Sequence, residues 1–355
     1  MIFVFFIYFL LITICCVYFM LGRDKYTAKE KFGATKNAVV VAAKNEENNI
    51  KKLLDDLTCQ TLENLEIIIV DDNSTDKTVE IIKKYQNKYP QIKLLSNIGH
   101  GKKAALETAI SNICVDFVFQ TDADCRLSPT WAENILKTAL KNDSQMVLAP
   151  VILVATNSKS VFQQLWVLES LSLITVTAGT CLAGIPTMSN GANIMYKLND
   201  RKKASLNSKY AGGDDMFLMQ DFLKKHKKIS YCFDSQVLTT VPKNWHQLLK
   251  QRARWVEKSG GYTQFAVIFF ALVVFGTNIG LILSFFLGLF GIIGWNNVII
   301  FYLLKTIPDL LSIIAPAVRF KIKVVPWIVF LLSVLYPFYT LAVAIKAFCS
   351  KTEWK

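Results

Sequence analysis

The chain has 355 residues, of which 52% are hydrophobic and only 19% are charged, and its net charge is +13. Soluble domains usually carry about 25% charged residues, so this composition excludes a disordered tail protein and argues against a purely soluble one. A basic chain this apolar indicates a membrane more than a nucleic acid, because Lys and Arg beside apolar segments face anionic lipid. We therefore expect a membrane, and no nucleic acid, among its partners.

The first hydrophobic segment covers residues 1–22 and contains no charged side chain. It is long enough to cross a hydrocarbon core, which needs about 20 helical residues. No basic residue precedes it, so a cleavable signal peptide is not indicated. By the positive-inside rule, the end of this helix is predicted to face the cytoplasm because four basic residues follow it, namely Arg23, Lys25, Lys29 and Lys31.

Residues 32–258 have the composition of a soluble domain, and short apolar runs alternate there with helical patterns. We predict strands at 38–42, 65–70, 92–95 and 115–119, and helices at 46–57, 77–89 and 102–111. This alternation predicts an α/β domain with a mostly parallel sheet and helices on both faces. Ligands of such sheets bind at the carboxyl ends of the strands, so the residues after each strand are candidates for a site. The scattered cysteines form no CxxC pair and are expected to be reduced cytoplasmic thiols.

Carboxylates follow two of these predicted strands. Asp71 and Asp72 follow the second strand, where the alternative role is to cap the next helix, because Asp favours turns and helix starts. Asp122 and Asp124 follow the last strand. Two carboxylates on alternate residues of a turn can hold one hard cation, such as Mg²⁺ or Mn²⁺, together with a diphosphate. No glycine-rich phosphate loop accompanies them, so the usual ATP and dinucleotide fingerprints are missing.

Two further motifs come later in the chain. Asp214 and Asp215 begin a helical pattern, and each is either a helix cap or a carboxylate that accepts a proton. Gln251, Arg254 and Trp255 form the pattern QxxRW just before a hydrophobic segment. The alternatives for this motif are a basic membrane anchor and a helix that places Arg254 against a phosphate and Trp255 against a sugar ring.

The region 259–348 contains about three hydrophobic segments, which we predict near 263–290, 297–317 and 324–345. Lys305 and Asp309 are four residues apart, so they share a helical face and can pair. The alternative to such a structural ion pair is a role in transport. Four membrane spans in all would place the C-terminus outside the cytoplasm. The basic residues near the C-terminus favour the cytoplasmic side, so we expect one C-terminal segment to be re-entrant or interfacial. These basic residues are Lys346, Lys351 and Lys355.

Taken in order, the motifs resemble those of the membrane-bound family 2 inverting glycosyltransferases, which have a GT-A fold and a D, D, D, QxxRW signature. The resemblance covers nearly the whole chain and includes Ala43-Lys44-Asn45-Glu46-Glu47, Asp71-Asp72, Asp122-Ala123-Asp124, Asp214-Asp215 and Gln251 to Trp255. It implies that residues 32–258 form a GT-A nucleotide-sugar-binding domain between membrane segments at both ends. It also implies a hexosyltransferase that uses a nucleotide sugar, most simply a UDP-sugar, and Mg²⁺ or Mn²⁺.

The resemblance further implies roles for individual residues. Asp215 is expected to be the catalytic base, with Asp214 as the alternative because many relatives have Glu-Asp at these two positions. Asp124 and Asp122 are expected to hold the metal. The residues expected at the nucleotide sugar are Ala43, Glu46, Asp71, Asp72, Lys102 and Asp122. Lys102 is otherwise an ordinary lysine at a helix start. The residues expected on the diphosphate and acceptor side are Asn190, Gly191, Gln251, Arg254 and Trp255.

The identity of the acceptor is left open between two classes. A lipid or lipid-linked glycan needs only a groove at the membrane interface, whereas a growing polysaccharide needs a pore through the spans. The small number of spans favours the lipid. Outside the enzymes, the alternative is a membrane transport subunit with a soluble binding domain, which leaves the ordered motifs unexplained. We therefore predict an integral, multi-pass membrane protein whose catalytic domain is cytoplasmic.

Overall fold

The structure is a computed structural model that describes residues 1–23, 35–206, 210 and 212–349. Several basic residues used in the orientation arguments lie outside the described residues, namely Lys25, Lys29, Lys31, Lys351 and Lys355. The chain divides into two compact units. We call them the sheet unit, formed by residues 23–152 and 189–240, and the helix unit, formed by residues 1–22, 153–188 and the chain from Val241 on.

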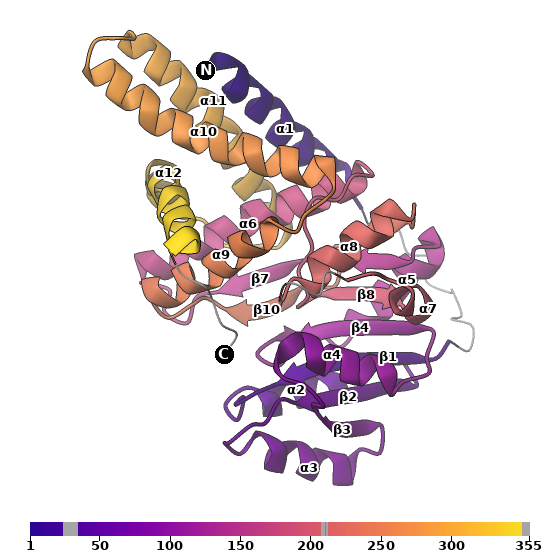
Figure 1. Cartoon of the computed structure of the whole chain (residues 1–355). Coiled ribbons are helices and arrows are strands. Elements are labelled where there is room, and N and C mark those ends of the chain that lie inside the picture. The colour runs from indigo at the N-terminus through magenta and orange to yellow at the C-terminus, as the bar shows by residue number, and fades with distance from the viewer. Residues whose placement is uncertain (24–34, 207–209, 211, 350–355) are drawn as a thin grey trace. The chain divides into compact units, whose positions relative to one another are not determined.

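The sheet unit follows the predicted alternation of strands and helices (Figure 1). Its elements are β1 (Asn37–Ala43), α2 (Ile50–Thr58), β2 (Leu65–Asp71), α3 (Thr78–Lys88), β3 (Ile92–Ser96), α4 (Gly101–Ser111), β4 (Phe117–Asp122), β5 (Arg126–Leu127), α5 (Trp131–Asn142), β6 (Met146–Leu148), β8 (Ile194–Lys197), α7 (Leu198–Lys202), α8 (Asp214–Lys224), β9 (Ile229–Tyr231) and β10 (Val237–Thr240). Strand β7 (Val151–Val154) crosses the boundary between the units. The predicted α/β class is confirmed.

A seven-stranded sheet has the strand order β3-β2-β1-β4-β8-β6-β9, and a smaller sheet has the order β5-β10-β7. The first four strands of the large sheet are parallel, whereas β8 is antiparallel to both β4 and β6. In the register of this sheet, Ala43 pairs with Asp71 and Ala42 pairs with Asp122. The carboxyl ends of β1, β2 and β4 therefore finish side by side, which brings the candidate carboxylates to one edge.

Helices cover the parallel part of the sheet. The apolar residues of α2 recur at Ile50, Leu53, Leu54 and Leu57, which is the spacing of one helical face, and each is at most 2% exposed. They share a hydrophobic core with alternate residues of β1, such as Val39, and with α5. Helix α4 packs against β1, β2 and β3. A strand buried on both faces and a helix with one apolar stripe thus assemble as the sequence pattern predicts.

The helix unit contains α1 (Ile2–Leu21), α6 (Val161–Leu182), α9 (Trp245–Ser259), α10 (Phe265–Leu289), α11 (Trp295–Arg319) and α12 (Pro326–Cys349). Among the described residues, five of these helices, all but α9, are long and apolar enough to cross a membrane. Helices α1, α10, α11 and α12 correspond to the hydrophobic segments predicted from the sequence. The sequence did not predict α6 as an apolar helix, and 72% of its most apolar window is buried inside the protein.

Specific contacts hold the helices of this unit together. A Cβ atom at Gly179 of α6 would lie 2.4 Å from the carbonyl oxygen of Cys15, so only glycine permits this approach of α6 to α1. The Arg319 guanidinium donates to the carbonyl oxygen of Gly22 at 2.7 Å, just beyond the end of α1. The predicted ion pair between Lys305 and Asp309 is present, and its lysine is fully buried.

Candidate active site

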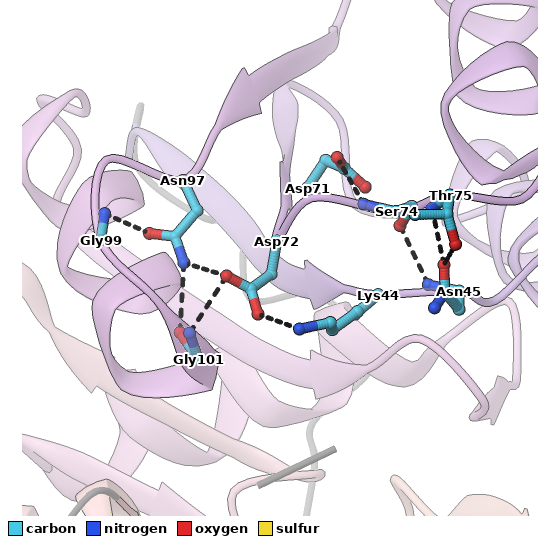
Figure 2. Close-up of polar contacts among 9 residues, drawn as sticks. All are labelled: Lys44, Asn45, Asp71, Asp72, Ser74, Thr75, Asn97, Gly99 and Gly101. Carbon is cyan, nitrogen blue, oxygen red and sulfur yellow. Dashed lines mark hydrogen bonds and ion pairs between the residues drawn. The ribbon is translucent and has the colours of Figure 1, made fainter.

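The loop after β1 and the loop after β2 are hydrogen-bonded to each other at the carboxyl edge of the sheet (Figure 2). Asn45 has a positive φ of 53°, a conformation that Asn tolerates better than most residues. Its backbone N–H donates to Ser74 Oγ at 2.9 Å, and its side-chain oxygen accepts from the Thr75 N–H at 2.8 Å. The Glu46 N–H donates to Thr78 Oγ1 at 2.7 Å. The two loops therefore form one fixed platform.

Asp72, one of the residues expected at the nucleotide sugar, is only 1% exposed. Its Oδ1 accepts from Asn97 Nδ2 at 2.5 Å and from the Gly101 N–H at 3.0 Å, while Oδ2 faces Lys44 Nζ at 3.4 Å. Figure 2 shows these partners on both sides of the carboxylate. Because Gly101 is the first residue of α4, Asp72 also lies at the positive end of that helix. Asp72 thus joins the end of β2 to the start of α4.

Asp71 and Ala43 lie beside this junction. Asp71 Oδ2 accepts from the Ser74 N–H at 3.2 Å, whereas its Oδ1 is buried and has no hydrogen-bond partner among the described residues. The Ala43 carbonyl accepts from the Asp72 N–H at 2.8 Å. A buried acceptor without a donor costs about 1–3 kcal/mol. A hydroxyl or N–H group of a ligand at this edge would satisfy it.

A second group of charges surrounds Lys102 in the first turn of α4. Its ammonium pairs with Asp122 at the end of β4. Burial alone would lower the pKa of Lys102, but the carboxylates of Asp122, Asp214 and Asp215 raise this pKa further than burial lowers it. Lys102 therefore stays charged, and three of the predicted carboxylates lie within its electrostatic reach.

Gln120 and Gly191 organise the carboxylates at the start of α8. The buried Gln120 side chain donates to Asp214 Oδ2 at 3.3 Å and to the Gly191 carbonyl at 3.1 Å. The Gly191 N–H donates to Asp215 Oδ2 at 2.7 Å. A Cβ atom at Gly191 would lie 2.9 Å from Gln120 Nε2, so a side chain there would displace its neighbours. The neighbouring Asn190 accepts a local hydrogen bond from the Ala192 N–H.

Asp122 and Asp124 have the oxygen donors that Mg²⁺ and Mn²⁺ prefer. Asp124 Oδ2 accepts from Thr239 Oγ1 at 3.2 Å. Burial and the neighbouring Asp122 raise the pKa of the Asp124 carboxyl, which shows negative charge that a cation would offset. No group of three or more His, Cys, Asp or Glu in the described ranges could hold a metal by itself. The two carboxylates fit a cation that takes its remaining ligands from phosphate oxygens and water.

The residues of the QxxRW motif, Gln251, Arg254 and Trp255, lie on α9 in the helix unit, whereas the predicted carboxylates lie in the sheet unit. Burial lowers the pKa of Arg254. No ion pair to Arg254 is present within the described part of the chain. Trp255 is 37% exposed, and its ring lies against the guanidinium of Arg252, 4.0 Å from that group to the ring centroid.

Sequence reasoning missed Gln120 and Arg252. Gln120 is a polar residue inside a buried strand, and that is the signal that could have identified it. Arg252 pairs with Glu169 of α6 and donates through Nε to the Tyr339 hydroxyl at 3.1 Å. The signal for this contact was Glu169 itself, since an acidic residue within an apolar helix requires a partner.

The pattern of glycosyl transferase family 2 matches residues 38–204. The chain is 34% identical over 108 residues to the glycosyltransferase YibD of Escherichia coli and 31% identical over 112 residues to the cholesterol galactosyltransferase of Borreliella burgdorferi. These matches cover 30% and 32% of this chain, and 31% of the length of each relative, so the chain spans about a third of the relatives that it matches.

A solved structure resembles the whole chain. It is the mannosyltransferase PcManGT from Pyrobaculum calidifontis, determined in complex with GDP-Man and Mn²⁺. The two share 16% of their residues, with a TM-score of 0.60 over 97% of this chain and 99% of that one. At this identity the likeness concerns the fold, and it confirms the predicted GT-A architecture with apolar helices at both ends.

Proposed function

The chain carries a glycosyl transferase family 2 domain, residues 38–204, and from this premise we propose that the protein transfers a sugar from a nucleotide diphosphate to an acceptor at the membrane. The observation that carries this proposal is the cluster of Lys102, Asp122, Asp214 and Asp215 at the carboxyl edge of the sheet. The Lys102 ammonium in this cluster can bind a diphosphate, and the carboxylates can accept a proton or hold a metal ion.

The donor nucleoside is proposed to bind at the platform formed by the loops after β1 and β2. Asp71 supports this placement because its buried Oδ1 has no hydrogen-bond partner among the described residues. Ala43 and Glu46 lie on the same platform. Asp72 acts there by ordering the loop that leads to Lys102, since its two oxygens already accept from Asn97, Gly101 and Lys44. A UDP-sugar remains the proposed donor.

The proposed reaction is a single displacement with inversion. The Asp215 carboxylate, held by the Gly191 N–H, takes the proton of the acceptor hydroxyl. The acceptor oxygen then forms its bond to the anomeric carbon from the face opposite the diphosphate, and the bond from that carbon to the diphosphate oxygen breaks. Lys102 offsets the charge that develops on the leaving diphosphate. Asp122 and Asp124 are suited to hold Mg²⁺ or Mn²⁺, which when bound would neutralise part of the same charge.

The acceptor is proposed to be a lipid or a lipid-linked glycan. The resemblance to a cholesterol galactosyltransferase supports a lipid. Arg254 and Trp255 support it as well, because α9 is followed within a few residues by the apolar helix α10. The intramembrane pair of Lys305 and Asp309 supports no transport role, since Asp309 also accepts from the Tyr8 hydroxyl and the pair is thereby satisfied within the helix unit.

The proposed membrane topology follows from chain connectivity. Strand β6 precedes α6 and β8 follows it, yet these two strands pair in one sheet. A single crossing by α6 would place them on opposite sides of the membrane, so we propose that α6 lies within the interface instead. Helix α12 is the proposed interfacial C-terminal segment, because Tyr339 near its middle bonds to Arg252 of α9. If α1, α10 and α11 cross the membrane, the sheet unit and Lys346 of α12 lie on the cytoplasmic side.

A direct experiment tests the transfer. The full chain in lipid nanodiscs is incubated with labelled UDP- and GDP-sugars and membrane lipids, and the product is extracted and sized. A labelled lipid is expected, and Asp215→Asn should lose transfer by about 10²-fold or more while donor binding remains. The control variant is Glu80→Gln, an exposed carboxylate of α3. An extract-insoluble polymer would instead show a polysaccharide synthase, and full activity of Asp215→Asn would refute the base assignment.

A further inference from the structure

Arg252 stands at the centre of the contacts that fix α9 within the helix unit. Its guanidinium pairs with Glu169 of α6 and donates to the Tyr339 hydroxyl of α12 at 3.1 Å. The ring of Trp255, one turn further along α9, lies 4.0 Å from the same guanidinium. Arg252 is 6% exposed and Glu169 is 3% exposed. One side chain therefore joins three helices and one ring of the QxxRW motif.

A second contact point lies two turns earlier on α9. Trp245, its first residue, packs edge-on against Phe162 and Trp166 of α6, with ring centroids 5.2 Å and 5.1 Å away. Trp245 and Arg252 share one face of α9, and their partners Phe162, Trp166 and Glu169 share one face of α6. Two contact points on matching faces fix both the register and the rotation of α9 against α6.

Stability alone is a poor explanation for a buried ion pair at this position. Burying two charges costs about as much as their attraction returns, so well-packed apolar residues of similar volume would hold two helices together equally well or better. Apolar contacts, however, tolerate rotation of one helix against the other, whereas a hydrogen-bonded ion pair requires one orientation. The pair between Arg252 and Glu169 therefore adds geometric specificity to the packing of α9.

We propose that Arg252 is a positioning residue for sugar transfer, a proposal that rests on the proposed function. Arg252 fixes the rotation of α9 and packs against one face of the Trp255 ring. It thereby determines the positions of Gln251, Arg254 and Trp255. Arg252 itself touches neither donor nor acceptor. A substrate-positioning group that moves by about 1 Å can lower the reaction rate by about 10²-fold, and we expect an effect of this size.

The test separates positioning from folding. Arg252→Met leaves Glu169 buried without its charge partner, whereas the double variant Arg252→Met/Glu169→Gln removes both charges and should recover the unfolding temperature. Lys250→Met, an exposed lysine of the same helix, is the matched control. For each full-length protein, kcat and the donor dissociation constant are measured. Iodide quenching of the Trp255 fluorescence is obtained as the difference in quenching between each protein and the same protein carrying Trp255→Phe.

The expected result is that both Arg252 variants lose kcat by about 10²-fold while the donor dissociation constant is unchanged. Quenching of Trp255 should increase in both, and Lys250→Met should match the parent protein in every measurement. Recovery of kcat together with the unfolding temperature in the double variant would overturn the proposal, because Arg252 would then serve only stability. If the parent protein transfers no sugar, the proposed function fails, and unchanged quenching of Trp255 in Arg252→Met would separately refute the positioning role.

Discussion

Asp72 offers a prediction whose size can be worked out from its hydrogen bonds. Replacement by alanine removes the acceptor for Asn97 Nδ2 and for the Gly101 N–H, which lie 2.5 Å and 3.0 Å from Oδ1. Each donor left without an acceptor costs about 1–3 kcal/mol. Both donors are half-buried, so water would satisfy them in part, and we expect Asp72→Ala to lower the free energy of unfolding by about 2–4 kcal/mol.

Asp72→Asn is the informative comparison, because the amide keeps one oxygen in place of Oδ1 and loses only the charge. The contact that disappears is the one to Lys44, whose nitrogen is 3.4 Å away and whose side chain is 34% exposed. Exposed ion pairs contribute about 0–1 kcal/mol. The asparagine variant should therefore lose less than about 1 kcal/mol, several-fold less than the alanine variant.

The assay is urea unfolding of the full chain in detergent, followed by far-ultraviolet circular dichroism. Glu80→Ala, which removes an exposed carboxylate paired with Lys84, serves as the control and should leave the free energy of unfolding nearly unchanged. Equal losses for Asp72→Ala and Asp72→Asn would refute the reasoning, because the charge would then matter more than the two hydrogen bonds to Oδ1.

Three further outcomes are expected. Gly191→Ala should reduce kcat by about 10-fold or more with little change in donor binding, because its Cβ would lie 2.9 Å from Gln120 Nε2, and steady-state kinetics check this. Burial raises the pKa of Asp76, but the hydrogen bonds from Thr78 and nearby backbone N–H groups together outweigh burial and lower this pKa. The stability that Asp76 provides should therefore be present above the ordinary carboxyl pKa and lost as pH falls below it. Asp76→Asn should flatten acid unfolding in that range. Removal of divalent cations by a chelator should abolish transfer, and Mn²⁺ or Mg²⁺ should restore it.

The alternation of strands and helices could be predicted because each local pattern determines its own element. The continuous apolar run of β1 and the apolar stripe of α2 are visible within a few residues. Because parallel strands end together, the meeting of Asp71 and Asp122 at one edge also followed from the pattern.

Helix α6 and the contact between Arg252 and Glu169 could not be predicted in the same way. The apolar residues of α6 face protein on most sides, so the helix shows no amphipathic stripe, and Glu169 interrupts its apolar sequence. Arg252 and Glu169 are 83 residues apart in sequence, and only the packing of α9 on α6 brings them together. Gln120 was missed because its partners, Gly191 and Asp214 at the start of α8, are distant in sequence.

The interruption of the sheet unit by α6 has a consequence for biosynthesis. A nascent chain that ends at Leu182, the last residue of α6, carries Asp122 and Asp124 but has neither Gly191 nor Asp215, and β6 still lacks its partner strand β8. The strand β8 that joins β4 to β6 is synthesised only after the whole of α6, so the sheet closes after this helix has been made. Assembly of the candidate site is thereby coupled to synthesis of α6, because Asp122 meets Gly191 and Asp215 only after this helix has been made.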